Sequence, residues 1–234
     1  MQPAIGTILT LISGISWSLV YIELIRRGFK DKTYGMPLFA LTLNLSWEFL
    51  FSLFFRNNDV VTLQTIINLI WCCFDIVIAY TYFRYGREDF SQHADPKWFV
   101  PWGLAAFVMS FGIIYFSAIE FGSNWGPIYT AFAQNLMMSV LFIGMLTKRK
   151  NVSGQSMYIA LFKWLGTAAP TVLFYAQTGS KLVLILGVGC FIYDGLYAFL
   201  LYRKFQELGL HPFTRQPIAL DKPVTAAVGA MPNK

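Results

Sequence analysis

Apolar stretches of about 20 residues recur seven times along the chain, with short polar segments between them. A helix of about 20 apolar residues is long enough to cross the ~30 Å hydrocarbon layer of a bilayer. The pattern therefore predicts an all-α, polytopic membrane protein, a bundle of seven transmembrane helices. The expected segments are Ala4–Ile25, Leu38–Phe55, Thr65–Phe83, Trp98–Ile119, Ile128–Leu146, Met157–Gln177 and Leu182–Tyr202.

The composition supports a membrane protein. Hydrophobic residues make up 56% of the chain and charged residues only 13%, whereas soluble domains carry about 25% charged residues. The net charge of +6 comes from basic residues clustered between the apolar stretches. This clustering argues against a nucleic-acid-binding surface, and no nucleic acid is expected as a partner.

Lys and Arg are distributed unevenly between the two sides of the expected bundle. The connections after the first, third and fifth segments hold four, three and three of them, and the residues after the seventh hold five. The connections after the second, fourth and sixth segments hold one, none and one. Because cytosolic loops are rich in Lys and Arg, we expect a lumenal N-terminus and a cytosolic C-terminus, in the endoplasmic reticulum membrane. Residues 1–205 would form the catalytic domain, and residues 206–234 a poorly ordered cytosolic tail.

Three acids interrupt the apolar segments near mid-depth: Glu48, Asp75 and Asp194. An acid at the centre of a membrane helix costs about 2.5–3.5 kcal/mol, so all three should point into the bundle. We expect Glu48 and Asp194 to face one pocket as catalytic residues, although each could instead be a polar contact between helices. Asp75 could line the same pocket or form a structural contact between helices, and the sequence favours neither alternative.

Polar and aromatic residues accompany these acids. Asn44 precedes Glu48 by one helical turn and can hold its carboxyl group in one orientation. Aromatic rings near the acids can stabilise a positive charge in a dry pocket. Lys163 lies nearer a segment end, where its ammonium group should reach the interface. The expected substrate-binding residues are Asn44, Trp47, Trp71, Asp75, Phe191, Tyr193 and Tyr197.

The sequence offers no recognisable metal site. Cys72, Cys73 and Cys190 all lie inside apolar segments, so reduced structural thiols are expected rather than disulfides. His93 and His211 share no metal-ligand spacing with them. The chain also lacks the metal-binding or acidic motifs D-D-x-x-D and D-x-D-D. We therefore expect no metal and no cofactor.

A carboxylic acid kept neutral by burial can donate a proton as a general acid. In a membrane protein with an aromatic-walled pocket, the substrate would be a lipophilic molecule entering from the bilayer. Protonation of an epoxide or an alkene, followed by guidance of the carbocation, fits these requirements.

Residues 44–48, Asn-Leu-Ser-Trp-Glu, and the pair Tyr193–Asp194 resemble motifs of the small fungal integral-membrane terpene cyclases of meroterpenoid and indole-diterpene pathways, the PaxB-like family. The resemblance extends over the seven-segment plan from about Ile5 to Phe205. It implies that Glu48 and Asp194 are the two essential acids. It also implies metal-independent, proton-initiated cyclisation of an epoxidised farnesyl or geranylgeranyl chain on an aromatic or indole core.

A seven-helix transporter of a small or lipophilic metabolite is the alternative, because transporters also carry acids at mid-depth. Transporters usually show internal repeats and helices broken at matching positions. This chain shows no repeat and one strong expected break, at Pro170. The cyclase is therefore the favoured hypothesis.

Overall fold

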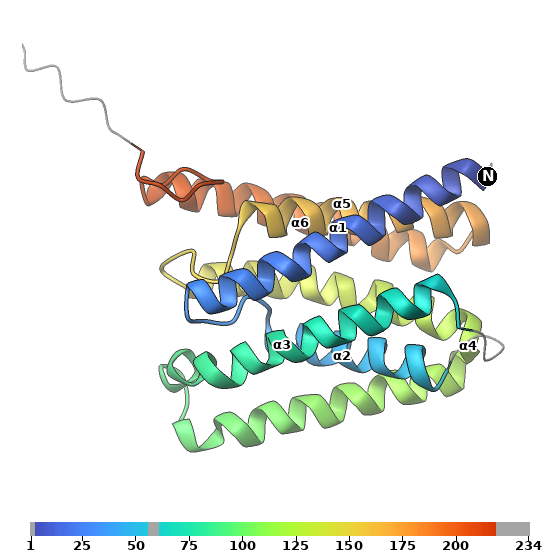
Figure 1. Ribbon diagram of the computed structural model, residues 1–234, viewed down its shortest axis with the longest axis horizontal. Coiled ribbons are helices and arrows are strands. Elements are labelled where there is room, and N and C mark those ends of the chain that lie inside the picture. The colour runs from blue at the N-terminus through green and yellow to red at the C-terminus, as the bar shows by residue number, and fades with distance from the viewer. Residues whose placement is uncertain (1–2, 56–60, 219–234) are drawn as a thin grey trace, which may run out of the picture.

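The computed structural model describes residues 3–55 and 61–218 of the protein. These residues form six α-helices and one 3-10 helix, without a strand, and the long helices lie side by side along the molecule (Figure 1). The prediction of an all-α fold is confirmed. The elements are α1 (Pro3–Lys30), α2 (Leu38–Leu53), α3 (Leu63–Ser91), η2 (Pro96–Trp98), α4 (Phe99–Lys148), α5 (Met157–Thr178) and α6 (Lys181–Glu207).

The expected count of seven helices is not confirmed, because the fourth and fifth expected segments belong to the single element α4. The residues between them, 120–127, were expected to form a linker, but only Gly122 departs from helical backbone, with φ 71° and ψ 173°. A positive φ is readily adopted by glycine because it has no Cβ. Pro127 lies inside the helix that follows.

At Gly122, α4 folds back on itself. A Cβ atom placed on Gly126 would lie 3.2 Å from the Cα atom of Ala118, whereas residues eight apart in a straight helix are about 12 Å apart. Figure 1 shows the two arms of α4 joined by this bend at one end of the bundle. The first arm is residues 99–121 and the second arm residues 123–148.

Short polar connections end and begin the other helices. The side chain of Thr62 caps the start of α3 by accepting a hydrogen bond from the backbone N–H of Thr65. Gly179 ends α5 in the left-handed conformation, with φ 66°, and Ser180 caps α6 immediately afterwards. These caps let α5 and α6 pack as neighbours with almost no loop between them.

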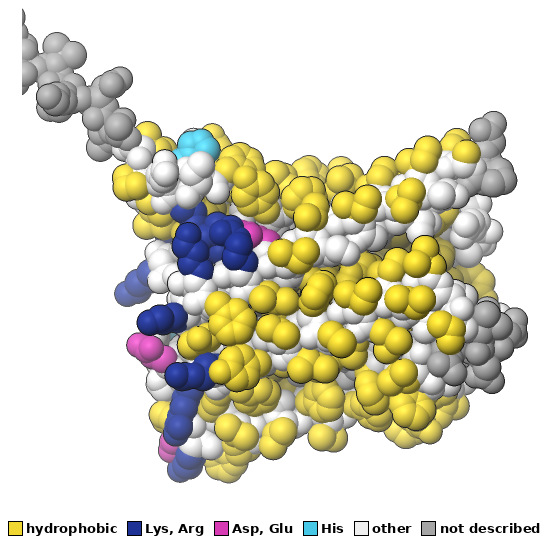
Figure 2. Space-filling model, in the orientation of Figure 1, with side chains coloured by type: hydrophobic (Ala, Val, Ile, Leu, Met, Phe, Trp, Pro, Cys, Tyr) yellow, Lys and Arg dark blue, Asp and Glu magenta, His cyan; other side chains and the backbone are white. Residues whose placement is uncertain are grey.

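The outer surface is apolar. Within residues 3–55 and 61–218, five elements are long and apolar enough to cross a membrane by length and composition: α1, α3, α4 together with η2, α5 and α6. α2 has 16 residues, which at 1.5 Å per residue is about 24 Å, and most of its side chains are buried. Hydrophobic side chains cover most of the face shown in Figure 2. Such an extensive apolar surface is typical of a protein that lies in a bilayer.

Basic side chains gather at one end of the molecule, where α1, α3 and α6 end (Figure 2). The α1 N-terminus and the bend of α4 lie at the opposite end (Figure 1). The charge asymmetry expected from the loops therefore corresponds to two distinct ends of one bundle.

Part of the expected tail is packed against the helices. Arg215 donates a hydrogen bond to Asp31, with 2.7 Å between Nη1 and Oδ2, and another of 2.7 Å to the carbonyl oxygen of Val152. Leu210 and Pro217 form an antiparallel bridge that closes this turn. The ordered structure thus extends past residue 205 to residue 218, and residues 219–234 lie outside the described ranges.

Candidate active site

A cavity of about 920 Å³ opens among α1, α2, α3, the second arm of α4, and α5. Its lining comes from residues 10–21 of α1, residues 44–51 of α2, the first half of α3, the first half of the second α4 arm and the second half of α5. All these segments lie toward the end opposite the basic side chains. A volume of about 300–1,000 Å³ is typical of pockets that bury a drug-sized ligand, so the cavity can hold a prenylated molecule.

Glu48 lines this cavity and is 1% exposed. Its Oε1 atom accepts hydrogen bonds from the hydroxyl of Tyr21 and from Nδ2 of Asn44, the latter at 3.0 Å. Its Oε2 atom is buried without a hydrogen-bond donor among the described residues, and the carboxyl groups of Glu48 and Asp75 lie within hydrogen-bond reach of each other. Because Glu48 lines the cavity and Asp75 does not, the Glu48 carboxyl group is the one that a molecule in the cavity would meet.

Asn44 connects Glu48 to the two neighbouring helices. Its Nδ2 atom is 2.8 Å from Oδ2 of Asp75 on α3, and its Oδ1 accepts a 3.2 Å hydrogen bond from Nε2 of Gln134 on α4. Tyr21 on α1 completes the set. Four elements therefore fix one carboxyl group, a rigid arrangement suited to catalysis.

Asp75 is fully buried, 0% exposed, and is not among the residues that line the cavity. Its contacts with Asn44 and with the carboxyl group of Glu48 join α3 to α2. This position agrees better with an interhelical contact than with direct substrate binding.

Two tryptophans line the cavity as expected. Trp47 donates its indole N–H to the carbonyl oxygen of Pro127 at 3.0 Å, and Trp71 donates to Oγ of Ser18 at 3.1 Å. Trp71 also stacks on Tyr21, with 5.8 Å between ring centroids. Further rings complete the wall: Phe51, Phe55, Phe132 and Phe174. Held aromatic faces beside a carboxyl group suit a cationic intermediate.

Asp194 is placed differently from the expectation. It is not among the residues that line the cavity, so the hypothesis that Glu48 and Asp194 face one pocket does not fit this arrangement. Its Oδ1 atom lies 2.6 Å from Nζ of Lys163 in an ion pair that is almost fully buried, 0% and 1% exposed. The expectation that Lys163 reaches the interface was wrong, because its acidic partner on α6 holds it inside.

The remaining α6 residues also lie away from the cavity. Phe191 is 52% exposed and Tyr193 40% exposed on the outer surface, because they flank the buried face of α6. Tyr197 is buried, packs against Phe142 and donates to Oε1 of Gln155 at 3.2 Å. None of the three is among the lining residues, so the structure does not place them at the substrate.

Sequence analysis missed two residues that hold the site, Tyr21 and Gln134. Tyr21 lies in a mainly apolar stretch of α1 that also holds several serines, so nothing distinguishes its hydroxyl as the one that contacts an acid. Gln134 is a mid-segment amide, and its partner Asn44 is 90 residues away in sequence. A buried tyrosine or amide needs a hydrogen-bond partner, but sequence does not identify that partner.

Across the ranges the structure covers, no three His, Cys, Asp or Glu side chains are grouped so as to hold a metal ion. The three cysteines are free. The carboxyl group of Glu48 is contacted by the phenol of Tyr21, the amide of Asn44 and the carboxyl group of Asp75.

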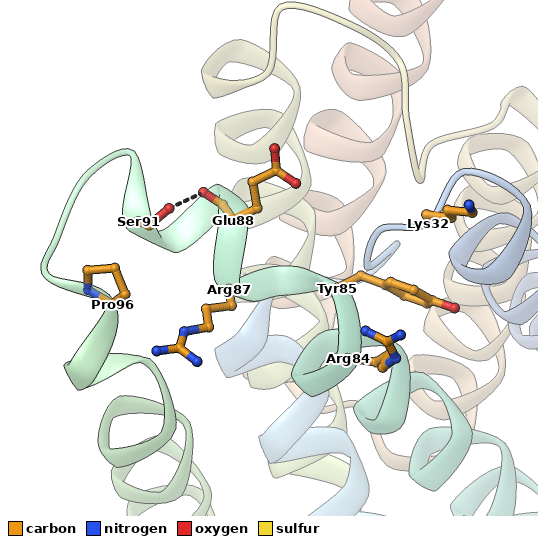
Figure 3. A pocket seen from close by; sticks show the side chains of 7 residues that line it. All are labelled: Lys32, Arg84, Tyr85, Arg87, Glu88, Ser91 and Pro96. Carbon is orange, nitrogen blue, oxygen red and sulfur yellow. Dashed lines mark hydrogen bonds between the residues drawn. The ribbon is translucent and has the colours of Figure 1, made fainter.

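A second hollow, of about 570 Å³, lies at the basic end of the bundle. Figure 3 shows Arg84 and Arg87 extending from the last turns of α3, with Lys32 from the connection after α1 and Pro96 from η2 beside them. Its charged lining does not suit an apolar chain, and none of the cavity-lining aromatics reaches it.

A family model described as Pyr4-like transmembrane terpene cyclases matches residues 2–207. The chain is 31% identical over 174 residues to the Pyr4-family terpene cyclase mfmH of Annulohypoxylon moriforme. This alignment covers 71% of this chain and 68% of that protein. It is 26% identical over 163 residues to the terpene cyclase pyr4 of Aspergillus fumigatus, covering 67% of this chain and 65% of that protein.

The terpene cyclase cle7 of Aspergillus versicolor is 28% identical over 217 residues, covering 84% of this chain and 86% of that protein. The aligned regions thus span about two thirds or more of these relatives. No solved structure matches the chain.

Proposed function

This chain belongs to the family of Pyr4-like transmembrane terpene cyclases, and we propose that Glu48 starts its reaction by donating a proton to an epoxidised prenyl chain. One observation supports the assignment: among the described residues, Glu48 is the one carboxylic acid that lines the aromatic cavity, and one of its oxygens accepts from no donor there. The transporter alternative is not supported, because the matched family and relatives are cyclases.

In this mechanism the proton passes from Glu48 to the epoxide oxygen, and a C–O bond of the ring breaks. The electron-poor carbon is attacked by the next alkene of the chain, so new C–C bonds form and the positive charge moves along the chain. Loss of a proton from carbon ends the cascade, so the product is an isomer of the substrate. The proton donor contributes about 10²–10⁴-fold to such a step.

Tyr21 and Asn44 support this role by holding Oε1, which leaves Oε2 to carry the reactive proton. The rings of Trp47 and Trp71 lie on the cavity wall, where an electron-rich ring face stabilises a cation by ~2 kcal/mol or more once water is excluded. The lipophilic substrate, an aromatic or indole core with a farnesyl or geranylgeranyl chain, would enter from the bilayer.

The direct test is incubation of membranes that contain this chain with epoxyfarnesyl and epoxygeranylgeranyl aromatics. Mass spectrometry should find a product of unchanged mass, and NMR should find new rings in place of the epoxide. Recovery of unreacted epoxide from all candidates, with protein present in the membrane, would contradict the proposed substrate class.

We further propose that the two arms of α4 cross the membrane separately, which gives seven crossings with the basic end in the cytosol. The sequon Asn151-Val152-Ser153 lies in the connection after α4, at that end. Because glycan transfer occurs in the lumen, Asn151 should remain unmodified. Treatment of the expressed protein with a glycosidase should leave its gel mobility unchanged, and a glycan at Asn151 would invert the proposed orientation.

Metal removal should not affect turnover, since the proposed acid needs no Lewis acid and the described residues form no metal-binding cluster. Product formation in excess EDTA should stay within about twofold of the untreated rate. A loss in EDTA that Mg²⁺ restores would instead show that a cation takes part.

A further inference from the structure

Lys163 and Asp194 are charged groups inside the bundle that the proposed proton transfer does not use. They lie on α5 and α6, and their ion pair is buried on all sides. The ammonium group of Lys163 also donates to Oγ of Ser139 on the second arm of α4, at 2.7 Å. One cation therefore joins the three consecutive helices α4, α5 and α6.

The contact with Ser139 leads to the cavity wall. The hydroxyl of Ser139 accepts from Lys163 and donates to the carbonyl oxygen of Asn135, one turn earlier, at 2.8 Å. Asn135 and Gln134 both line the cavity. Gln134 in turn donates to Oδ1 of Asn44, which holds the carboxyl group of Glu48.

We propose that Lys163 and Asp194 are a pair of positioning residues that fix the Gln134–Asn135 turn of α4 and, through Asn44, the orientation of Glu48. The inference rests on the proposed role of Glu48 as proton donor. Under this proposal, Asp194 affects turnover from outside the cavity, without touching the substrate.

The geometry argues against Asp194 as a second proton donor. A general acid must come within hydrogen-bond reach of the atom it protonates, and Asp194 is not among the cavity-lining residues. One of its oxygens is bound by the ammonium group of Lys163 at 2.6 Å, so that oxygen is already occupied. Leaving either member of a buried pair without its partner is unfavourable, so both residues should matter equally.

The test compares Asp194→Asn and Lys163→Gln with the double variant that carries both changes. Each single change leaves one buried charge unpaired and should lower kcat by about 100-fold with little change in KM. The double variant replaces the ion pair with two neutral amides that can hydrogen-bond to each other and to Ser139. It should recover to within about tenfold of the parent.

Failure of the double variant to recover, with protein in the membrane at parental levels, would overturn the proposal. That result would mean that the carboxyl group of Asp194 itself acts on the substrate. Parental turnover of Lys163→Gln alone would also overturn it, because a positioning pair needs both members.

Ser139→Ala decides the matter if the double variant does not accumulate. It keeps the ion pair but removes the link to Asn135, so kcat should fall by about tenfold at unchanged KM, and parental kinetics would overturn the proposal. Ser110→Ala is the matched control, because Ser110 is a buried serine on the first α4 arm that contacts Thr42 instead. An active Glu48→Gln variant would contradict the proposed function itself, independently of the turnover of the Lys163 and Asp194 variants.

Discussion

Glu48→Gln should abolish product formation while the protein still inserts and accumulates. The amide keeps the shape of the side chain and its contacts with Tyr21 and Asn44, but it cannot deliver a proton. Loss of a general acid costs about 10²–10⁴-fold in rate. If the carboxyl group only held helices together, the amide should work nearly as well, since polar contacts within membranes are worth about 0.6–2 kcal/mol.

The measurement is turnover per molecule of membrane-inserted protein, and Asp75→Asn is the matched control. Asp75 is an acid buried as deeply as Glu48 that contacts Asn44 and the Glu48 carboxyl group but does not line the cavity. Its amide keeps those contacts, so a smaller loss than that of Glu48→Gln is expected if only Glu48 donates the proton. Near-parental turnover of the Glu48 variant would remove that residue from the proton-donating role.

Asn44→Leu should lower kcat by about 100-fold, the second-largest effect expected from a single change in the cavity. Leucine has a similar size but leaves Oε1 of Glu48, Oδ2 of Asp75 and Nε2 of Gln134 without their shared partner. An unsatisfied buried group costs about 1–3 kcal/mol, and a misoriented carboxyl group loses its reach to the substrate. Steady-state kinetics of the purified variant measure the loss.

Thr42→Val controls for the removal of a buried polar side chain from the same helix. Thr42 is buried and contacts Ser110 at 2.8 Å, but it does not touch the network around Glu48. Turnover of this variant should stay within about threefold of the parent. Equal losses from the two changes would mean that α2 tolerates no polar-to-apolar change, and the specific role of Asn44 would be withdrawn.

The sequence by itself determined the class of the protein and the residues that were costly to bury. Apolar stretches of membrane length predict helices because a bilayer offers no partner for unpaired backbone groups. Glu48, Asp75 and Asp194 were predicted to point inward for the same energetic reason, and all three are buried. Asn44 was predicted to touch Glu48 from helical spacing alone, and its amide does so.

The bend of α4 was harder to predict. Residues 120–127 contain polar side chains, two glycines and a proline, which favour a linker. The chain instead turns at Gly122 alone, since one residue with positive φ suffices to redirect a helix. The residue pattern of 120–127 predicted where the chain changes direction. It did not predict that a single glycine would be enough to make the turn.

Only the tertiary structure decided which acids share a space. Helical periodicity tells which residues share a face of one helix, but it carries no information on which helices become neighbours. Glu48 therefore faces the cavity with Tyr21 and Gln134, from α1 and α4, whereas Asp194 faces Lys163 on α5. Both acids could be recognised in the sequence because an acid is costly to bury in a membrane. The packing of the helices then gave them different partners.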